Sequence, residues 1–204
     1  MTMSTRPRPG DRPDIPEDCP HEGAVLILLY QERGRLWFPL TVRTTSVHAH
    51  KGQISLPGGS RESQDGEFMD LTAKRETSEE LGIPVHAIRI LGRLTPLYIP
   101  HSGFCVYPFV GHISHRRWRD SSGHPEWHAD AGEVAEVFAA PVDGLLQPAM
   151  VHTEIHVRDG QPFQVPVYQF GEHKVWGATA MILAELAAVI STGPSADQAA
   201  EPER

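Results

Sequence analysis

The stretch GGSRESQDGEFMDLTAKRETSEELGI, residues Gly58 to Ile83, decides the fold of this chain. Its second half carries three carboxylates, Glu76, Glu79 and Glu80, at positions i, i+3 and i+4. On a helix that turns about 100° per residue, these side chains share one narrow stripe. Like charges at that spacing destabilise a helix unless a cation compensates them. Because Mg²⁺ binds a few carboxylates together with water and phosphate oxygens, the stripe predicts a metal site rather than a merely solvated face.

Glycines stand on both sides of this acidic helix. Gly58 and Gly59 follow the alternating run Gly52–Leu56, which predicts a short strand. Two glycines at a strand end allow positive φ angles and a close approach of a ligand to the backbone. Gly82 and then Pro84 predict the end of the helix. An uncharged ridge beside the acidic stripe is expected to pack on a core: Met69, Ala73, Thr77 and Leu81.

This arrangement resembles the Nudix box, the signature of the Nudix hydrolases: Gly, five residues, Glu, seven residues, then Arg-Glu-apolar-x-Glu-Glu-x-Gly-apolar. The second half matches over Arg75–Ile83, with Thr77 at the first apolar position. The loop between the two halves is longer than in the general pattern. Asp65 has the expected spacing from Gly59, whereas Glu67 has the expected spacing from the arginine. Either residue could fill the early acidic position.

The resemblance implies a role for each charged residue of the helix. Glu76, Glu79 and Glu80 would hold one or more Mg²⁺ or Mn²⁺ ions that bridge a diphosphate. Arg75 would orient these carboxylates through an ion pair. A glutamate would take the proton of the attacking water, and the candidates are Glu79 and Glu133, which follows an acidic segment later in the chain. For Glu133, a surface carboxylate at the start of a strand is an equally good interpretation.

Residues upstream of the box are similar to the coenzyme A pyrophosphatase branch of the family. That branch carries an L-T-x-R stretch, matched by Leu40–Arg43, and an H-x-G-Q run ending in Pro-Gly-Gly, matched by His50–Gly59. The resemblance extends from about residue 23 to residue 190. It implies that substrate contacts come from Arg43, His48, His50, Lys51, Gly58 and Gly59.

Two positions depart from that branch. His48 stands where the branch usually has arginine, and Leu56 stands where it has phenylalanine. Arginine can hold a phosphate through two hydrogen bonds at any pH, whereas histidine offers at most one charged donor near neutrality. The resemblance makes coenzyme A the favoured substrate, while these departures argue against it and make ADP-ribose or another nucleoside diphosphate-X the alternative. A nucleotide-binding sensor without activity is a third interpretation, although the three clustered carboxylates argue against it.

Composition excludes several other classes of protein. The chain has 204 residues, a formal net charge of −8 and a pI near 5.8, which argues against nonspecific binding to nucleic acid. No apolar run reaches membrane-spanning length, and the first twenty residues lack the apolar segment of a signal peptide. A cytoplasmic protein is therefore expected. Its two cysteines, Cys19 and Cys105, could form a disulfide, but reduced thiols are expected, with Cys105 in the core.

The chain divides into a flexible arm over 1–21, a Nudix hydrolase domain over 22–190 and a disordered tail over 191–204. The resemblance and the element order imply the α/β class, as the Nudix α/β/α sandwich with a mixed sheet. A terminal helix is expected over Gly177–Ile190. The other expected strands are Gly23–Tyr30, Leu36–Arg43, Arg89–Leu97, Cys105–Ile113, Glu133–Ala139, His152–Val157 and Phe163–Phe170.

Several other residues have two interpretations. Trp118 and Trp127 either stack on a nucleotide base or pack within the protein, and Trp176 belongs to the core or to a dimer surface. A basic cluster could steer phosphates or simply keep a loop soluble: Arg116, Arg117 and Arg119. The twelve histidines are scattered and lack zinc-ligand spacing. A homodimer is possible, but no sequence feature requires one.

Overall fold

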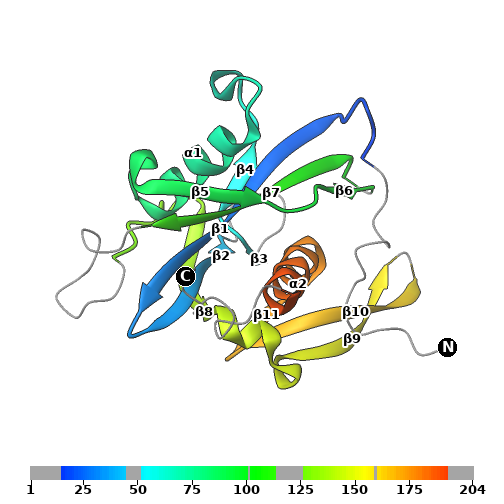
Figure 1. The fold of residues 1–204 in the computed structure, drawn as a ribbon. Helices are drawn as coiled ribbons and strands as arrows, with labels where there is room; N and C mark the ends of the chain where they lie inside the picture. The colour runs from blue at the N-terminus through cyan, green and yellow to red at the C-terminus, as the bar shows by residue number, and fades with distance from the viewer. Residues whose placement is uncertain (1–14, 45–51, 101, 114–125, 159, 193–204) are drawn as a thin grey trace, which may run out of the picture.

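The central strand β1 (His21–Glu32) is apolar on both faces because a layer of the protein covers each of them (Figure 1). Ala24, Leu26 and Leu28 pack toward one side, whereas Ile27 packs toward the other, and all four are buried. Near-continuous apolar strands of this kind are typical of a sheet between two layers. The computed structural model describes residues 15–44, 52–100, 102–113, 126–158 and 160–192.

Two sheets are present in the described residues. In the main sheet the order is β3-β2-β1-β7-β5, while β4 pairs with β1, β6 with β7 and β8 with β2. β1 and β7 run parallel and the other pairs are antiparallel, so the main sheet is mixed. A second, antiparallel sheet has the order β11-β10-β9. The strand bounds are β2 (Arg35–Arg43), β3 (Ile54–Ser55), β4 (Gly58–Ser60), β5 (Ile88–Arg93), β6 (Leu97–Ile99), β7 (Phe104–Ile113), β8 (Val134–Pro141), β9 (Val151–Arg158), β10 (Gln161–Phe170) and β11 (His173–Val175).

One α-helix covers each face of the main sheet (Figure 1). α1 (Met69–Leu81) packs on β1 through Ala73 and Leu81, and α2 (Gly177–Thr192) lies between the main sheet and the second sheet. These layers confirm the predicted α/β class and mixed sheet, to which the chain adds a small antiparallel sheet beyond α2. Short 3₁₀ helices cover Ser63–Asp65, Val85–Ala87, Val142–Leu146 and Pro148–Met150.

Both ends of the acidic helix agree with the sequence. Gly82 adopts a left-handed conformation with φ 67° and ends α1, and its N–H donates to the carbonyl of Ser78. A side chain on Gly82 would also collide with His128. Thr77, the polar residue at an apolar position of the box, is buried, and its hydroxyl donates to the carbonyl of Ala73 at 2.7 Å. The departure therefore leaves no unsatisfied hydroxyl in the core.

Most of the predicted strands are confirmed with small changes of boundary. The strand predicted over Gly52–Leu56 is shorter and comprises Ile54 and Ser55 alone. The strand predicted over Arg89–Leu97 is two strands, because residues 94–96 belong to neither β5 nor β6. Within β5, the register against β7 also shifts between Ile90 and Gly92. β11 was not predicted, since three residues carry too little pattern. Most of the predicted arm and tail lies outside the described residues.

The two cysteines form a disulfide, so the expectation of reduced thiols is wrong. Cys19 and Cys105 have their Cα atoms 6.2 Å apart and are 86 positions apart in sequence. Parallel pairing of β1 with β7 sets Glu22 opposite Cys105, and this pairing brings the preceding Cys19 to the same place. Cys105 is fully buried, as expected. No long-range contact of this kind is visible in a single sequence.

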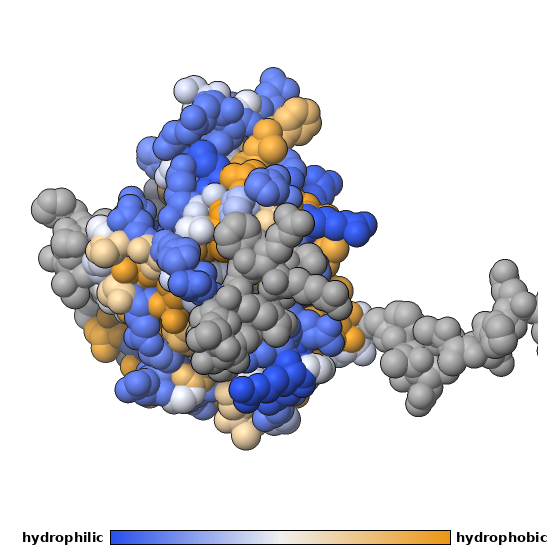
Figure 2. Space-filling model, turned by 90° about the vertical axis from the view of Figure 1, so that its left-hand side faces the viewer, coloured by the Kyte–Doolittle hydropathy of each residue, from blue (hydrophilic) through white to orange (hydrophobic). Residues whose placement is uncertain are grey.

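The molecular surface is mainly polar on the face that Figure 2 shows, with apolar residues scattered among hydrophilic ones. Elsewhere β9 exposes Ile155 and Val157, at 72% and 69% of their area. The possible homodimer stays a prediction. In the described part of the chain, no helix is long and apolar enough to cross a membrane.

Candidate active site

Glu80 is the buried centre of the acidic stripe. It is only 4% exposed, and its Oε2 accepts a hydrogen bond from the backbone N–H of Gly58 at 3.2 Å. Gly58 has φ 152°, and a side chain there would collide with the backbone of Val25 on β1. Only glycine can therefore occupy this point and present its N–H to the carboxylate. The glycine turn and the acidic helix are thus joined directly.

Glu76 lies against the second glycine of the turn. A Cβ atom on Gly59 would overlap the carboxylate of Glu76, so the glycine leaves the space that this carboxylate occupies. The side chain of Glu76 is 15% exposed, whereas that of Glu79 is 58% exposed. Along the predicted stripe, burial therefore decreases from Glu80 to Glu76 to Glu79. Gly58 and Gly59, predicted as substrate contacts, lie against the carboxylates.

Arg75 connects the helix to the preceding turn. Its guanidinium donates to Asp65 at 2.8 and 3.0 Å, to Glu79 at 2.9 Å and to the carbonyl of Ser60 at 3.0 Å, and it pairs with Glu76 at 2.9 Å. Asp65 is buried, and its carboxylate pairs with this arginine, whereas Glu67 is exposed. Asp65 therefore fills the early acidic position that the sequence left open between these two residues.

Charged residues from other parts of the chain act on the carboxylate stripe. Burial raises the pKa of Glu80 to about 7; the Gly58 N–H and Arg43 oppose this increase, while Glu76 and Glu133 add to it. Burial also raises the pKa of Glu76, and repulsion from Glu133 contributes. Glu133, just before β8, and Arg43, at the end of β2, therefore lie close to the stripe. The structure brings these two predicted residues together with the helix.

Arg43 has a buried Nε atom without a hydrogen-bond partner in the described structure. A buried donor without a partner costs about 1–3 kcal/mol, so an acceptor from a bound molecule would be stabilising there. The other predicted substrate contacts, His48, His50 and Lys51, lie outside the described residues. The structure therefore places Arg43 alone among the predicted cationic contacts.

The carboxylates fit a hard divalent cation by their chemistry. As they stand, no three carboxylate, imidazole or thiolate groups of the described residues converge closely enough to hold a metal ion. Arg75 engages Glu76 and Glu79 instead. Glu76 and Glu80 nevertheless repel each other in a buried site, and a cation between them would relieve that repulsion. Glu76, Glu79 and Glu80 are therefore the residues that would hold the metal.

The remaining predicted residues are divided between core and undescribed segments. Trp127 packs edge-on against the buried ring of Tyr30, with centroids 5.7 Å apart, which favours the packing interpretation over base stacking. Trp176 is half-buried against His156, with ring centroids 4.6 Å apart. Four further candidates lie outside the described residues: Trp118, Arg116, Arg117 and Arg119.

Some functional contacts were missed by sequence reasoning. The backbone N–H of Gly58 that binds Glu80 carries no side-chain signal. The hydroxyl of Thr72 donates to Asp65 at 3.0 Å, and this contact joins the turn to the first half of α1. Asp65 precedes α1, so its contact with Thr72, seven residues later, does not follow from helical spacing. Only the folded turn shows this contact.

Comparisons with known proteins agree on one family. A family model described as the NUDIX domain matches residues 20–159. An uncharacterized Nudix hydrolase, NudL, of Photorhabdus laumondii is 33% identical over 148 residues, which are 72% of this chain and 74% of that protein. An uncharacterized NudL of Salmonella heidelberg is 34% identical over 185 residues, 90% of this chain and 91% of the relative.

Solved structures support the same fold. The Nudix hydrolase RenU from M. smegmatis has a TM-score of 0.56 at 18% identity and covers 86% of this chain and 88% of its own. A MutT/nudix family protein from Enterococcus faecalis has a TM-score of 0.54 at 19% identity, covering 88% of this chain and 66% of its own. At such low identity these likenesses concern the fold alone.

Proposed function

Because the chain belongs to the Nudix family of hydrolases, which act on pyrophosphate bonds, we propose that it is a metal-dependent pyrophosphohydrolase of a nucleoside diphosphate linked to another group. One observation carries the proposal: Glu80 is buried against Gly58, and the partly buried Glu76 lies against Gly59. The charges of Glu133 and Arg43, which come from other elements, act on Glu80. Nudix hydrolases generally use divalent cations, and Mg²⁺ or Mn²⁺ suits this set of oxygen donors.

The residues divide the work as follows. Glu76, Glu79 and Glu80 would hold the cation, which when bound would supply charge neutralisation at the diphosphate and lower the pKa of water. Arg75, which is itself bound to Asp65, holds the carboxylates of Glu76 and Glu79 in place. Arg43 contacts a phosphate oxygen through the guanidinium that has a buried, unpartnered Nε.

Proton removal is assigned to a carboxylate. We assign it to Glu133, because its charge acts on both Glu76 and Glu80 from a separate segment of the chain. Glu79 is the alternative, although Arg75 already binds its Oε2 atom. In either case the carboxylate oxygen accepts a proton from the attacking water as the new P–O bond forms and the bridging P–O bond breaks, with its electron pair left on the departing phosphate.

Coenzyme A is the favoured substrate, cleaved to 4′-phosphopantetheine and adenosine 3′,5′-bisphosphate. The support is the similarity of Leu40–Arg43 and His50–Gly59 to the coenzyme A pyrophosphatase branch. His48, His50 and Lys51 would complete the phosphate contacts of Arg43. With His48 in place of arginine, ADP-ribose is the second candidate, since it lacks the 3′-phosphate that the arginine would bind. The same proposal assigns residues 22–190 to the catalytic unit, 1–21 to an arm and 191–204 to a tail.

A turnover assay by mass spectrometry tests the proposal. The protein is incubated with coenzyme A, dephospho-coenzyme A, ADP-ribose, NADH and nucleoside triphosphates, with Mg²⁺, with Mn²⁺ or with a chelator. Metal-dependent release of adenosine 3′,5′-bisphosphate above all other products is the expected result. Preferential cleavage of ADP-ribose would transfer the assignment to that substrate. Metal binding without turnover of any compound would favour the nucleotide sensor.

A further inference from the structure

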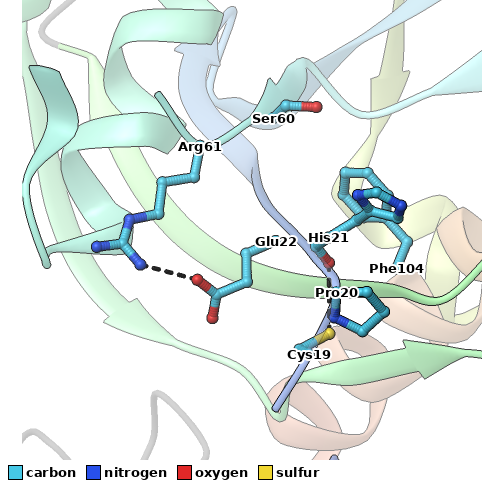
Figure 3. A pocket seen from close by; sticks show the side chains of 7 residues that line it. All are labelled: Cys19, Pro20, His21, Glu22, Ser60, Arg61 and Phe104. Carbon is cyan, nitrogen blue, oxygen red and sulfur yellow. Dashed lines mark hydrogen bonds and ion pairs between the residues drawn. The ribbon is translucent and has the colours of Figure 1, made fainter. Parts of the chain in front are cut away.

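The start of β1 and the end of β4 line a small pocket beside the Cys19–Cys105 disulfide (Figure 3). Two oppositely charged side chains meet there: Arg61 Nη1 lies 2.8 Å from Glu22 Oε2. Tyr107 on β7 donates its hydroxyl to the other oxygen of Glu22 at 3.0 Å. Glu22 is therefore held from two sides. None of these residues belongs to the carboxylate stripe described above.

The guanidinium of Arg61 connects this pocket to the turn that contains Asp65. Arg61 Nε donates to the carbonyl of Gly66 at 2.8 Å, and the backbone N–H of Arg61 donates to the carbonyl of Glu22 at 2.9 Å. One side chain thus links the central strand to the residue immediately after Asp65. The two guanidinium contacts of Arg61, with the Glu22 carboxylate and the Gly66 carbonyl, are both 2.8 Å long and charge-assisted. They are therefore stronger than neutral hydrogen bonds.

Two reciprocal hydrogen bonds between Glu62 and Asp65 close the turn that precedes Gly66. The N–H of Glu62 donates to Asp65 Oδ2 at 2.9 Å, and the N–H of Asp65 donates to the carbonyl of Glu62 at 3.0 Å. A displacement of Gly66 would therefore be transmitted to Asp65. Asp65 in turn holds Arg75, which holds Glu76 and Glu79. The contacts form a continuous path from the pocket to the candidate metal site.

We propose that Arg61, fixed by Glu22, is a positioning residue for the metal site: it sets the Asp65 turn, and through Arg75 it sets the carboxylates. The inference rests on the proposed function, because it concerns where the carboxylates stand when a cation binds. The Arg61 and Glu22 side chains are 34% and 28% exposed, and partly exposed ion pairs contribute little to stability. Loss of the pair should therefore change metal affinity far more than folding.

The test compares two Arg→Met variants of the full chain. Arg61→Met removes the donors and keeps most of the side-chain volume. Arg35→Met is the matched control, since Arg35 makes a similar two-bond contact with Asp143 on an exposed surface. Equilibrium Mn²⁺ binding is followed by electron paramagnetic resonance, and thermal unfolding is recorded for each protein. We expect Arg61→Met to weaken Mn²⁺ binding by about tenfold, the lower end of the loss for direct partners of metal ligands, because Arg61 acts through Asp65 and Arg75.

The control and the conservative variants make the result specific. Arg35→Met should bind Mn²⁺ like the wild type, with a small shift in melting temperature comparable to that of Arg61→Met. Arg61→Lys should recover part of the affinity, because one ammonium can reach either Glu22 or the Gly66 carbonyl but lacks the fork for both. Glu22→Gln should also weaken binding, and the double variant with Arg61→Met should lose less than the sum of the two.

Two outcomes would overturn the inference, and they differ. If the wild type binds Mn²⁺ and Asp65→Asn weakens that binding while Arg61→Met does not, the path ends at Asp65 and Arg61 has no positioning role. If the wild type binds no Mn²⁺ at all, the metal site of the proposed function fails, and the inference fails with it.

Discussion

Asp65 accepts four hydrogen bonds, from the backbone of Glu62, from the hydroxyl of Thr72 and, twice, from the guanidinium of Arg75. Its side chain is only 4% exposed, so water cannot replace these donors at low cost. The arginine hydrogen bonds are the main cause that lowers the pKa of Asp65 to about 2. This carboxylate therefore stabilises the folded state only while it is ionised.

Replacing Asp65 with Asn should lower the free energy of unfolding at neutral pH by about 3 kcal/mol, because it leaves Arg75 partly uncompensated. Since the folded pKa is about 2 and the unfolded pKa about 4, the contribution is complete above about pH 4 and is lost as the pH falls toward 2. Urea unfolding of both proteins between pH 2 and pH 7 measures this difference, which should shrink at the acid end.

Asp143→Asn is the control for that experiment. It removes the same carboxylate type from a two-bond contact with Arg35, but on an exposed surface. Its cost should be below about 1 kcal/mol. Equal costs for the two variants would mean that the burial of Asp65 contributes nothing to the strength of its pair.

Glu80→Gln should reduce kcat at least about a hundredfold while the protein stays folded. Glutamine has the same shape and can still accept the N–H of Gly58, but it carries no charge to balance a cation. Steady-state turnover with Mg²⁺, together with circular dichroism, measures both effects. Glu136→Gln on β8 is the control, because Glu136 pairs with His173 away from the stripe. Near-normal turnover by Glu80→Gln would remove Glu80 from the metal site.

At this scale the sequence predicts which residue types gather but not how each is paired. The spacing of Glu76, Glu79 and Glu80 follows directly from helical geometry, and α1 places them as expected. The choice between Asp65 and Glu67 depends on the path of a turn, and both spacings are compatible with the sequence. Contacts with backbone groups, such as the N–H of Gly58 on Glu80, have no side-chain pattern.

Among elements, the glycine pair Gly58–Gly59 at the start of β4 joins the main sheet to α1. Its two glycines are required for different reasons. Gly58 lies against the backbone of β1, which cannot move without disturbing the sheet. Gly59 lies against the far end of the Glu76 side chain, which can rotate away. One position therefore maintains the fold and the other maintains the site.

Gly58→Ala should lower the free energy of unfolding by about 2–3 kcal/mol, from overpacking against Val25 and from a positive φ. Gly59→Ala should change stability little but displace the Glu76 carboxylate, with losses of Mn²⁺ affinity and kcat of about tenfold or more. Thermal unfolding and Mn²⁺ titration of both variants separate the two effects. Interchanged results, with stability lost at Gly59 and affinity alone at Gly58, would contradict this division.

The sequence predicts well those elements that have a long, regular pattern. β1, β2, β7 and β10 have eight or more residues of β-type pattern, and their predicted bounds agree with the structure to within a few positions. Short elements fail because pairing partners, rather than local pattern, decide them. β11 has three residues and exists because it pairs with β10. β3 is two residues long for the same reason, through its pairing with β2.

At the scale of the whole molecule, the parallel pairing of β1 with β7 determines what a single sequence cannot show. It joins segments about eighty residues apart, with His21 opposite Phe104 and Glu22 opposite Cys105. The expected cytoplasmic location favoured reduced thiols, because disulfides are rare in the cytosol. The cytoplasmic location stays a prediction, and it requires a cross-link that survives a reducing environment.

The disulfide should be detectable and stabilising. Unfolding the purified protein in iodoacetamide without reductant should leave both Cys19 and Cys105 unmodified in the intact mass. Dithiothreitol should then lower the free energy of unfolding of the wild type by about 2–4 kcal/mol, since it frees a loop of 86 residues in the unfolded chain. Cys19→Ser should start from the lower value and be indifferent to dithiothreitol. Alkylation of both cysteines in the unreduced protein would instead show that the thiols are reduced, as the sequence predicts. That result would agree with the predicted cytoplasmic location.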